Sequence, residues 1–188
     1  LMEQMIERSD NDSTDALAKA VIDPTFAPME VTEDMKALGI ENTYWAGFFT
    51  PGSPMLQDYK TPANQRTDFS TEPDRYAQTT PQDLGLLLED IYYCAKDYGG
   101  SFPLAFNGEI TQEECQLMVD YLALNKIGVL IQAGVPADVT VAHKHGWAYE
   151  VDDGYIHTIA DAGIVYTPGG DYVLSIFAYH PVQAVFEP

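Results

Sequence analysis

The chain has 188 residues, of which 46% are hydrophobic, so it is long enough and apolar enough to bury the core of one domain. Its formal net charge of −20 at pH 7 disfavours nucleic acid and anionic membrane surfaces as partners, because like charges repel at long range. No apolar stretch reaches the ~18 residues that a membrane span needs, and no signal peptide is recognisable.

The first 138 residues are predicted to be mostly helical. Apolar residues recur at helical spacing within residues 1–8. Polar residues then precede a helix expected from about residue 13 to residue 22. A short helix should follow, with Thr32 as its N-cap and Gly39 as its stop.

Residues 40–78 are expected to form a long but ordered loop. The segment holds four prolines, which disfavour regular structure, and seven aromatic residues, which argue against a flexible linker. The next helix should begin with Thr80 as N-cap and Pro81 as its first residue. Thr111 and Glu114 have the spacing of a capping box at the start of another helix.

Two cysteines, Cys94 and Cys115, lie in these last two helical patterns. Their spacing fits no Cys-x-x-Cys metal or redox motif. They are either two buried thiols or a disulfide between neighbouring helices, and the second alternative requires an oxidising compartment.

Residues 139–180 are predicted to form an antiparallel meander. Three runs, "DVTVAHKHGWAYEV", "YIHTIADAGIVYT" and "DYVLSIFAYH", are rich in β-branched and aromatic residues, and the turn signals "DDG" and "PGGD" separate them. Because the helices come first and the strands last, the predicted fold class is α+β.

Two short motifs each have an ordinary structural interpretation. Ser9-Asp10-Asn11 consists of residues that commonly cap helices. Lys144-x-Gly146 is compatible with a solvated edge strand, where a charge discourages aggregation.

The histidines suggest a metal site but do not complete one. His143 and His145 are two residues apart on a strand and therefore share a face. A zinc site needs about three or four ligands, and although His157 and His180 lie on later strands, no carboxylate or cysteine spacing supports convergence. The sequence predicts no metal and no cofactor.

Taken in order, these motifs resemble the serine β-lactamase and penicillin-binding protein superfamily, whose motif set is Ser-x-x-Lys, Ser-Asp-Asn and Lys-Thr-Gly. The class A-like group is most similar, because "TTPQDLGLLLEDI", "LNKIGVLIQAGVP" and "IVYTPGGDYVLSIFAY" resemble its later segments. The resemblance covers nearly the whole chain. It implies a sandwich of helices on an antiparallel sheet, with residues 1–188 forming one partial domain.

The resemblance also implies roles for the first motif and for the lysine. Ser9 matches a serine that relays a proton toward the leaving nitrogen, and Asn11 matches the residue that binds the substrate's amide group. Asp10 matches a structural position, expected to be buried and hydrogen-bonded. Lys144 matches the lysine that provides positive potential for Ser9 and for a substrate carboxylate.

The residues around Lys144 are implied to border the substrate. Gly146 would let a ligand backbone approach the strand, and the backbone N–H of Trp147 would donate to the oxyanion. His145 replaces the usual hydroxyl residue and would bind the substrate carboxylate in a pH-dependent way near its ordinary pKa of ~6.5. Ideal strand alternation, however, puts Lys144 and His145 on opposite faces, so both can border the cleft only if the strand is twisted or lies at an edge of the sheet.

The chain also departs from the family pattern. No lysine is preceded by a serine three residues earlier, so the nucleophile of Ser-x-x-Lys is missing. The sequence starts inside a helical pattern and stops after a strand-like run, which we interpret as the limits of a C-terminal piece. Its sheet should then expose an apolar face and an unpaired edge.

No acidic residue occupies the place of the family's deacylating glutamate, which falls near Asn64 or Phe49 depending on the alignment. Glu72-Pro73 imitates the family's Glu-Pro pair but lies too close to the Thr79-Thr80-Pro81 helix start. Slow deacylation favours a penicillin-binding, peptidase-like or esterase-like hydrolase.

Two functional hypotheses follow. The first is a serine hydrolase that forms an acyl-enzyme with a β-lactam or a D-Ala-D-Ala-like amide, acts on a small-molecule or peptidoglycan-like substrate, and resides outside the cytoplasm. The second is a non-catalytic binding or scaffold domain that keeps the fold.

Overall fold

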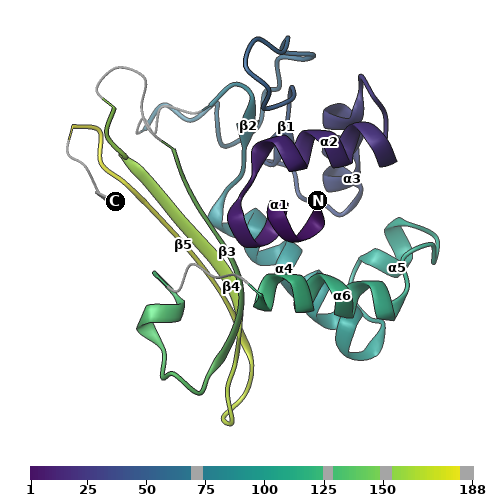
Figure 1. Cartoon of the computed structure of the whole chain (residues 1–188), viewed down its shortest axis with the longest axis vertical. Coiled ribbons are helices and arrows are strands. Elements are labelled where there is room, and N and C mark those ends of the chain that lie inside the picture. Colours follow the sequence, from purple (N-terminus) through teal and green to yellow (C-terminus); the bar gives the residue numbers. More distant parts are fainter. Residues whose placement is uncertain (69–73, 125–128, 149–153, 183–188) are drawn as a thin grey trace.

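The computed structural model describes residues 1–68, 74–124, 129–148 and 154–182. Its α-helices gather on one side of a twisted three-stranded antiparallel sheet (Figure 1), so the predicted α+β class is confirmed. Helices α4 and α6 pack directly on the sheet, and α1 packs on α6 and α2.

The described helices are α1 (Met2–Arg8), α2 (Asn11–Val21), α3 (Ala27–Ala37), α4 (Pro81–Asp97), α5 (Phe102–Ala105), α6 (Gln112–Ala123) and the 3-10 helix η1 (Gln132–Gly134). The described strands are β1 (Tyr44–Trp45), β2 (Ala77–Gln78), β3 (Thr140–Ala148), β4 (Thr158–Tyr166) and β5 (Tyr172–Tyr179). None of the helices within the described ranges has the length and apolar character needed to cross a membrane.

Local capping signals place the helix boundaries of the later part of the chain. Thr80 accepts a hydrogen bond from the backbone N–H of Asp83 and Pro81 opens α4, as predicted. Thr111 and Glu114 form the predicted capping box at the start of α6. These boundaries are confirmed because each depends on residues within one helical turn.

Two boundaries in the first part were predicted wrongly. Helix α2 begins at Asn11, because the Asp10 carboxylate accepts the Ser13 N–H at 2.8 Å and caps the helix two residues early. Helix α3 begins at Ala27, so Thr32 lies inside it, fully buried. The Thr32 hydroxyl accepts the N–H of Trp45 at 2.9 Å and therefore holds β1 against α3.

The described part of the long loop, residues 40–68 and 74–78, is ordered, as expected, and β1 pairs with β2 at its base. The part of the loop that follows β1 is fixed to α2. The buried Asp15 carboxylate accepts the backbone N–H of Phe49 at 2.9 Å and of Thr50 at 2.8 Å. The Glu72-Pro73 pair lies outside the described residues.

A second buried carboxylate fixes the base of the loop to α4. Asp83 accepts the backbone N–H of Asn42 at 2.8 Å and the Thr43 hydroxyl at 2.9 Å. The side-chain amide of Asn42 also donates to Asp83 at 3.3 Å. Carboxylates on two helices thus satisfy several backbone N–H groups of the loop, in addition to the short β1–β2 ladder.

The sheet has the order β3-β4-β5, and its two faces have different partners. Ala142, Ala162 and Ile164 are buried in the core cluster with α4 and α6. Because strand residues alternate, Lys144 and Gly146 share this helix-facing side. On the other face, Val141 packs in a smaller cluster around Ile131.

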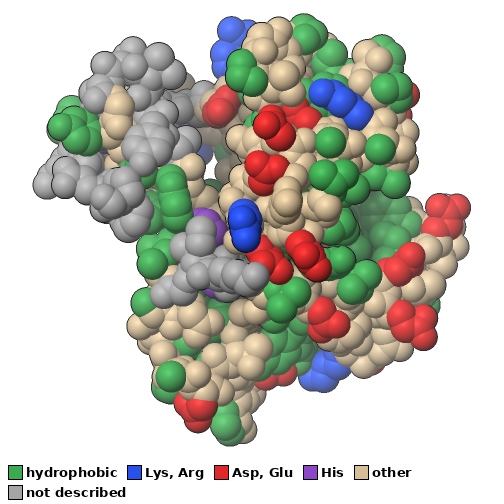
Figure 2. Space-filling view, viewed as in Figure 1, with side chains coloured by type: hydrophobic (Ala, Val, Ile, Leu, Met, Phe, Trp, Pro, Cys, Tyr) green, Lys and Arg blue, Asp and Glu red, His purple; other side chains and the backbone are tan. Residues whose placement is uncertain are grey.

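The far side of the sheet is partly uncovered. Tyr172 and Ile176 on β5 are 46% and 51% exposed. Within the described part of the chain, β3 and β5 each pair with β4 alone, so one edge of each is unpaired, as expected. The predicted "PGGD" turn is present, with Gly170 N–H donating to Thr167 O at 3.1 Å, whereas most of the "DDG" turn lies outside the described residues. Acidic side chains are scattered over the visible surface (Figure 2), which fits the net charge of −20.

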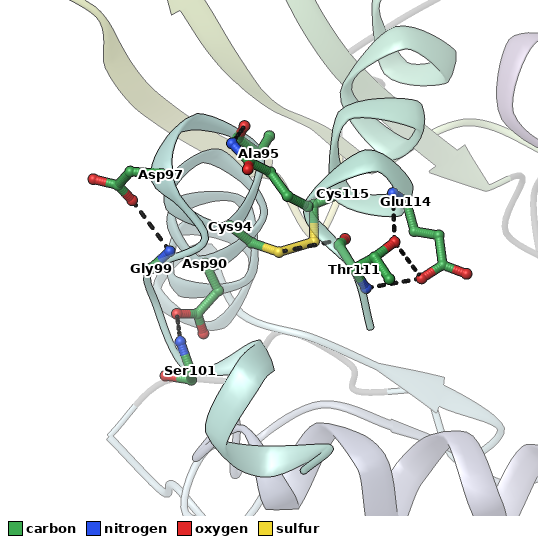
Figure 3. The surroundings of a disulfide bond; sticks show 10 residues. Asp90, Cys94, Ala95, Asp97, Gly99, Ser101, Thr111, Glu114 and Cys115 are labelled. Atoms are coloured by element: carbon green, nitrogen blue, oxygen red, sulfur yellow. Dashed lines mark hydrogen bonds between the residues drawn. A yellow bond between two sulfur atoms is a disulfide. The ribbon is translucent and has the colours of Figure 1, made fainter. Parts of the chain in front are cut away.

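Cys94 of α4 and Cys115 of α6 form a disulfide, with 5.8 Å between their Cα atoms (Figure 3). Both residues are fully buried. The bond joins the two helices that rest on the sheet, beside the Thr111–Glu114 capping box, and Gln112 adds a hydrogen bond to the Ala95 carbonyl at 3.0 Å. The structure therefore adopts the second of the two alternatives for the cysteines.

We predict that replacing both cysteines, Cys94→Ala with Cys115→Ala, lowers the free energy of unfolding by about 3 kcal/mol. The bond closes a separation of 21 residues, and cross-links of that length restrict the unfolded chain by this amount. Denaturant titration of the oxidised protein and the double variant measures the difference. Dithiothreitol should destabilise the natural protein and leave the double variant unchanged, and an equal response of both would contradict the prediction.

Candidate active site

The turn between α1 and α2 presents Ser9 to solvent. Ser9 ends α1 with φ 54° and ψ 39°, the left-handed conformation that a residue with a Cβ adopts at a cost of about 1 kcal/mol or more. This conformation reverses the chain within one residue, so that Asp10 can cap α2 immediately afterwards. The exposed Ser9 hydroxyl consequently stands at the junction of two helices.

Lys144 reaches Ser9 across the fold. Its ammonium group donates hydrogen bonds to the Ser9 hydroxyl oxygen and, at 3.0 Å, to the His145 carbonyl. The two residues are 135 positions apart in sequence, and the helix-facing side of β3 brings them together. Burial lowers the pKa of Lys144, and the negative charge of Asp161 opposes that shift.

The pair has the properties of a proton relay. A hydroxyl can accept one hydrogen bond and donate another. When its oxygen accepts a bond from an ammonium group, its own proton remains available to a third atom, and a positive charge lies beside that atom. Ser9 and Lys144 therefore have the arrangement that a proton path beside a local positive charge requires.

The rest of the Ser-Asp-Asn triplet lies beside this pair. Asp10 is a structural residue, because its carboxylate caps α2 and hydrogen bonds from Ser13 lower its pKa. It is partly exposed rather than buried as expected, since a capping side chain sits at the end of its helix. Asn11 is the first residue of α2, and its side chain is exposed next to Ser9.

Gly146 leaves open space along β3. The residue is exposed, and a Cβ at this position would meet no atom within 4 Å. It lies on the same face as Lys144 and on a strand whose outer edge is unpaired within the described residues. A ligand backbone could approach the strand here.

His145 does not lie where the sequence suggested. Its side chain is only 4% exposed and is on the opposite face of β3 from Lys144, with its ring stacked on Trp147 at 4.6 Å between centroids. Strand alternation accounts for this placement. The expected contact between the His145 ring and a substrate carboxylate is incompatible with it.

The buried position of the His145 ring also lowers its pKa. Burial, and after it the positive charge of Lys144, lowers the pKa of His145 to about 4. Asp161 opposes the shift, and His143 adds to it. The ring is therefore neutral at physiological pH, and the expected titration near pH ~6.5 does not apply.

A buried His143–Asp161 pair lies on the same face and was not found by sequence reasoning. His143 is 1% exposed, and its Nδ1 is 2.9 Å from the Asp161 carboxylate, which also accepts the Ile131 N–H at 3.0 Å. Gly163 lies opposite His143, where a Cβ would come within 2.6 Å of the histidine Cβ. The one sequence signal was Asp161, an acidic residue within the otherwise apolar run "IADAGIV".

The Asp161 carboxylate is the hydrogen-bond partner of His143 Nδ1. In the described ranges, no three His, Cys, Asp or Glu side chains come close enough together to hold a metal ion.

A protein-family model described as "Beta-lactamase enzyme family" matches residues 1–186. The chain belongs to the beta-lactamase enzyme family. No protein with a curated description matches the sequence.

Solved structures of this fold are similar over almost the whole chain. A class A beta-lactamase from Bacteroides cellulosilyticus is 22% identical with a TM-score of 0.67, and the match covers 97% of this chain and 55% of the other. PBP-A is 22% identical with a TM-score of 0.59, covering 95% and 51%. A beta-lactamase from Chitinophaga pinensis is 17% identical with a TM-score of 0.61, covering 96% and 56%. The chain thus spans about half the length of the structures it matches.

We predict that the His145 ring titrates near pH 4 in the folded protein. The folded pKa is lower than the ordinary value of 6.5, so the unfolded chain binds the proton more tightly. The contribution of His145 to the unfolding free energy is therefore fully present above pH 6.5 and is lost as the pH falls toward 4. An NMR titration of the ring, assigned with His145→Gln, measures this pKa. A midpoint near 6.5 would contradict the buried placement.

Proposed function

We propose that this chain carries the proton-relay and substrate-binding side of a serine acyl-transfer site that acts on β-lactams or D-Ala-D-Ala-like amides. The observation that carries the proposal is the hydrogen bond from Lys144 to Ser9, which joins the two family motifs. The sequence contains no Ser-x-x-Lys, so the proposal places the nucleophilic serine outside these 188 residues.

Each residue has a defined task in this proposal. Ser9 passes a proton to the leaving nitrogen while Lys144 stabilises the negative charge that develops nearby. The exposed amide of Asn11 binds the substrate's acyl-amide group. The open strand at Gly146 accommodates the substrate backbone, and the Trp147 backbone N–H donates to the oxyanion.

An anionic substrate fits the charge distribution. The protein carries a net charge of −20, so an anion needs a local cation to be attracted to the site. Lys144 provides that cation. Because His145 lies on the other face, the proposal assigns the substrate carboxylate to Lys144 and Ser9 alone among the residues named from the sequence.

A location outside the cytoplasm is part of the proposal. It is supported by the Cys94–Cys115 disulfide, because such bonds persist in oxidising compartments. Peptidoglycan-like substrates also occur outside the cytoplasm.

A second candidate is a non-catalytic binding domain of the same fold. Two observations favour it: the absence of Ser-x-x-Lys from the chain, and His145 in place of the family's hydroxyl residue. The two candidates differ in one property, since only the first forms a covalent adduct with a β-lactam.

We predict that the protein, expressed at its natural length, forms a covalent adduct with a fluorescent penicillin. Ser9→Ala and Lys144→Ala should each slow acylation about 100-fold, since positioned proton transfer contributes at least that much. Ser53→Ala and Lys60→Ala serve as matched controls on residues away from the site. Gel fluorescence measures the rates, and mass spectrometry locates the adduct.

The residue to which the penicillin is attached determines whether the proposal holds. Attachment to a serine outside residues 1–188 supports the proposal, and attachment to Ser9 contradicts its relay role. If no adduct forms with any β-lactam, the binding-domain candidate replaces the enzyme.

Hydrolysis of the acyl-enzyme is expected to be slow, because neither place aligned with the deacylating glutamate is acidic. Of the two, the structure favours Phe49. Its backbone is bonded to Asp15, one helical turn after Asn11, whereas the Asn64 side chain is engaged within its own loop with Thr61 and Tyr59.

We predict that Phe49→Glu accelerates deacylation at least about tenfold, because a carboxylate there can act as general base for water. Asn64→Glu is the matched control and should leave deacylation unchanged. Release of the fluorescent label over time measures both rates. A larger effect of Asn64→Glu would reverse the assignment.

A further inference from the structure

A cavity of about 290 Å³ lies between α4 and the start of β5, and neither motif uses it. One wall is formed by Glu89, Tyr92 and Tyr93, which share a face of α4 at helical spacing. Asp171 and Val173 at the start of β5 form the opposite wall. Tyr172 between them also borders the cavity, but strand alternation turns its ring to the far face of the sheet. The cavity is on the β5 edge of the sheet, and the Ser9–Lys144 pair is on the β3 side.

The walls combine aromatic rings with carboxylates. Tyr93 is 42% exposed, so part of its ring is accessible to solvent. The Tyr92 hydroxyl donates to the Asp171 carboxylate at 2.9 Å, which orients both groups. The faces of aromatic rings carry partial negative charge, and carboxylates carry full charge, so this cavity suits a positive group.

One cation of the protein already binds at the margin of this cavity. The Lys96 ammonium lies 4.9 Å from the centroid of the Tyr92 ring and donates to the Tyr92 hydroxyl at 2.8 Å. The hydrogen bond to Tyr92 raises the pKa of Lys96, and the negative charge of Asp171 adds a smaller increase. A primary ammonium group is therefore stabilised by these side chains within the molecule itself.

We propose that this cavity binds the ammonium group of a small organic cation, with the tyrosine rings around the charge, Glu89 and Asp171 beside it, and an alkyl part against Val173. A volume of about 290 Å³ holds a ligand of a few heavy atoms. The proposal does not depend on the acyl-transfer function, because it uses none of the same residues.

The direct test titrates the protein, at its natural length and constant ionic strength, with n-butylammonium and with tetramethylammonium. Saturable shifts in the NMR signals of the Tyr92 and Tyr93 rings are expected with at least one of them. Tighter binding of butylammonium indicates hydrogen-bonded recognition by the carboxylates, and tighter binding of tetramethylammonium indicates recognition by the rings. n-Butanol, the uncharged analogue, should cause no saturable shift.

Two variants test the walls separately. Tyr93→Leu should weaken binding roughly fivefold, the contribution of one cation–aromatic contact, whereas Tyr155→Leu changes an exposed tyrosine outside the cavity. Glu89→Gln should weaken binding, whereas Glu113→Gln removes one exposed helix carboxylate elsewhere and should not. Circular dichroism confirms that each variant is folded.

Three results would overturn the proposal. Equal binding of butanol would mean that the charge is irrelevant. Equal weakening by Glu89→Gln and Glu113→Gln would mean that the cation responds to the net charge alone. The absence of a saturable shift with both cations would mean that Lys96 satisfies the cavity without a ligand.

Discussion

The alternation of side chains along β3 is the constraint on which both faces of the sheet depend. A strand exposes every second residue to one side, so the five positions from Ala142 to Gly146 divide between two environments. Ala142 and Lys144 face the helices, and there Ala142 fills the core while Lys144 extends to the α1–α2 junction. His143 and His145 face the other way and are buried there, His143 beside Asp161 and His145 against Trp147. Strand alternation thus places the candidate active-site lysine on one face of the sheet and the two buried histidines on the other.

The loop after β1 consists largely of irregular backbone, which is held in place by side chains of the neighbouring helices. Asp15 and Asp83 accept several loop donors each from buried positions on α2 and α4, and Thr32 inside α3 does the same for β1. A buried carboxylate is stable when its lone pairs are filled, and backbone N–H groups fill them here. Since Asp15 follows Asn11 by one turn of α2, the same helix positions both the loop and the candidate site.

Features determined within one helical turn were predictable from the sequence. The capping box of Thr111 and Glu114 and the start of α4 at Pro81 belong to this class. Thr32 was misassigned because its partner, Trp45, comes from another element, and a hydroxyl that caps helices locally can equally bond a distant backbone. The family resemblance brought Ser9 and Lys144 together correctly, although the left-handed backbone of Ser9 has no signature in residue type. The family motif predicted that the His145 side chain borders the substrate cleft. The alternation of side chains along the strand instead places it on the other face.

Gly163 has a consequence for how the β3–β4 hairpin forms. It is the β4 residue paired with His143, and there is no room between them for even one methyl group. If β4 slipped by one residue, Ala162 or Ile164 would take this place and its side chain would collide with the histidine. The misaligned hairpin would also turn Asp161 away from His143 and leave a buried carboxylate without its partner. The native register is thus the one in which Gly163 leaves room for His143 and Asp161 can pair with the histidine ring.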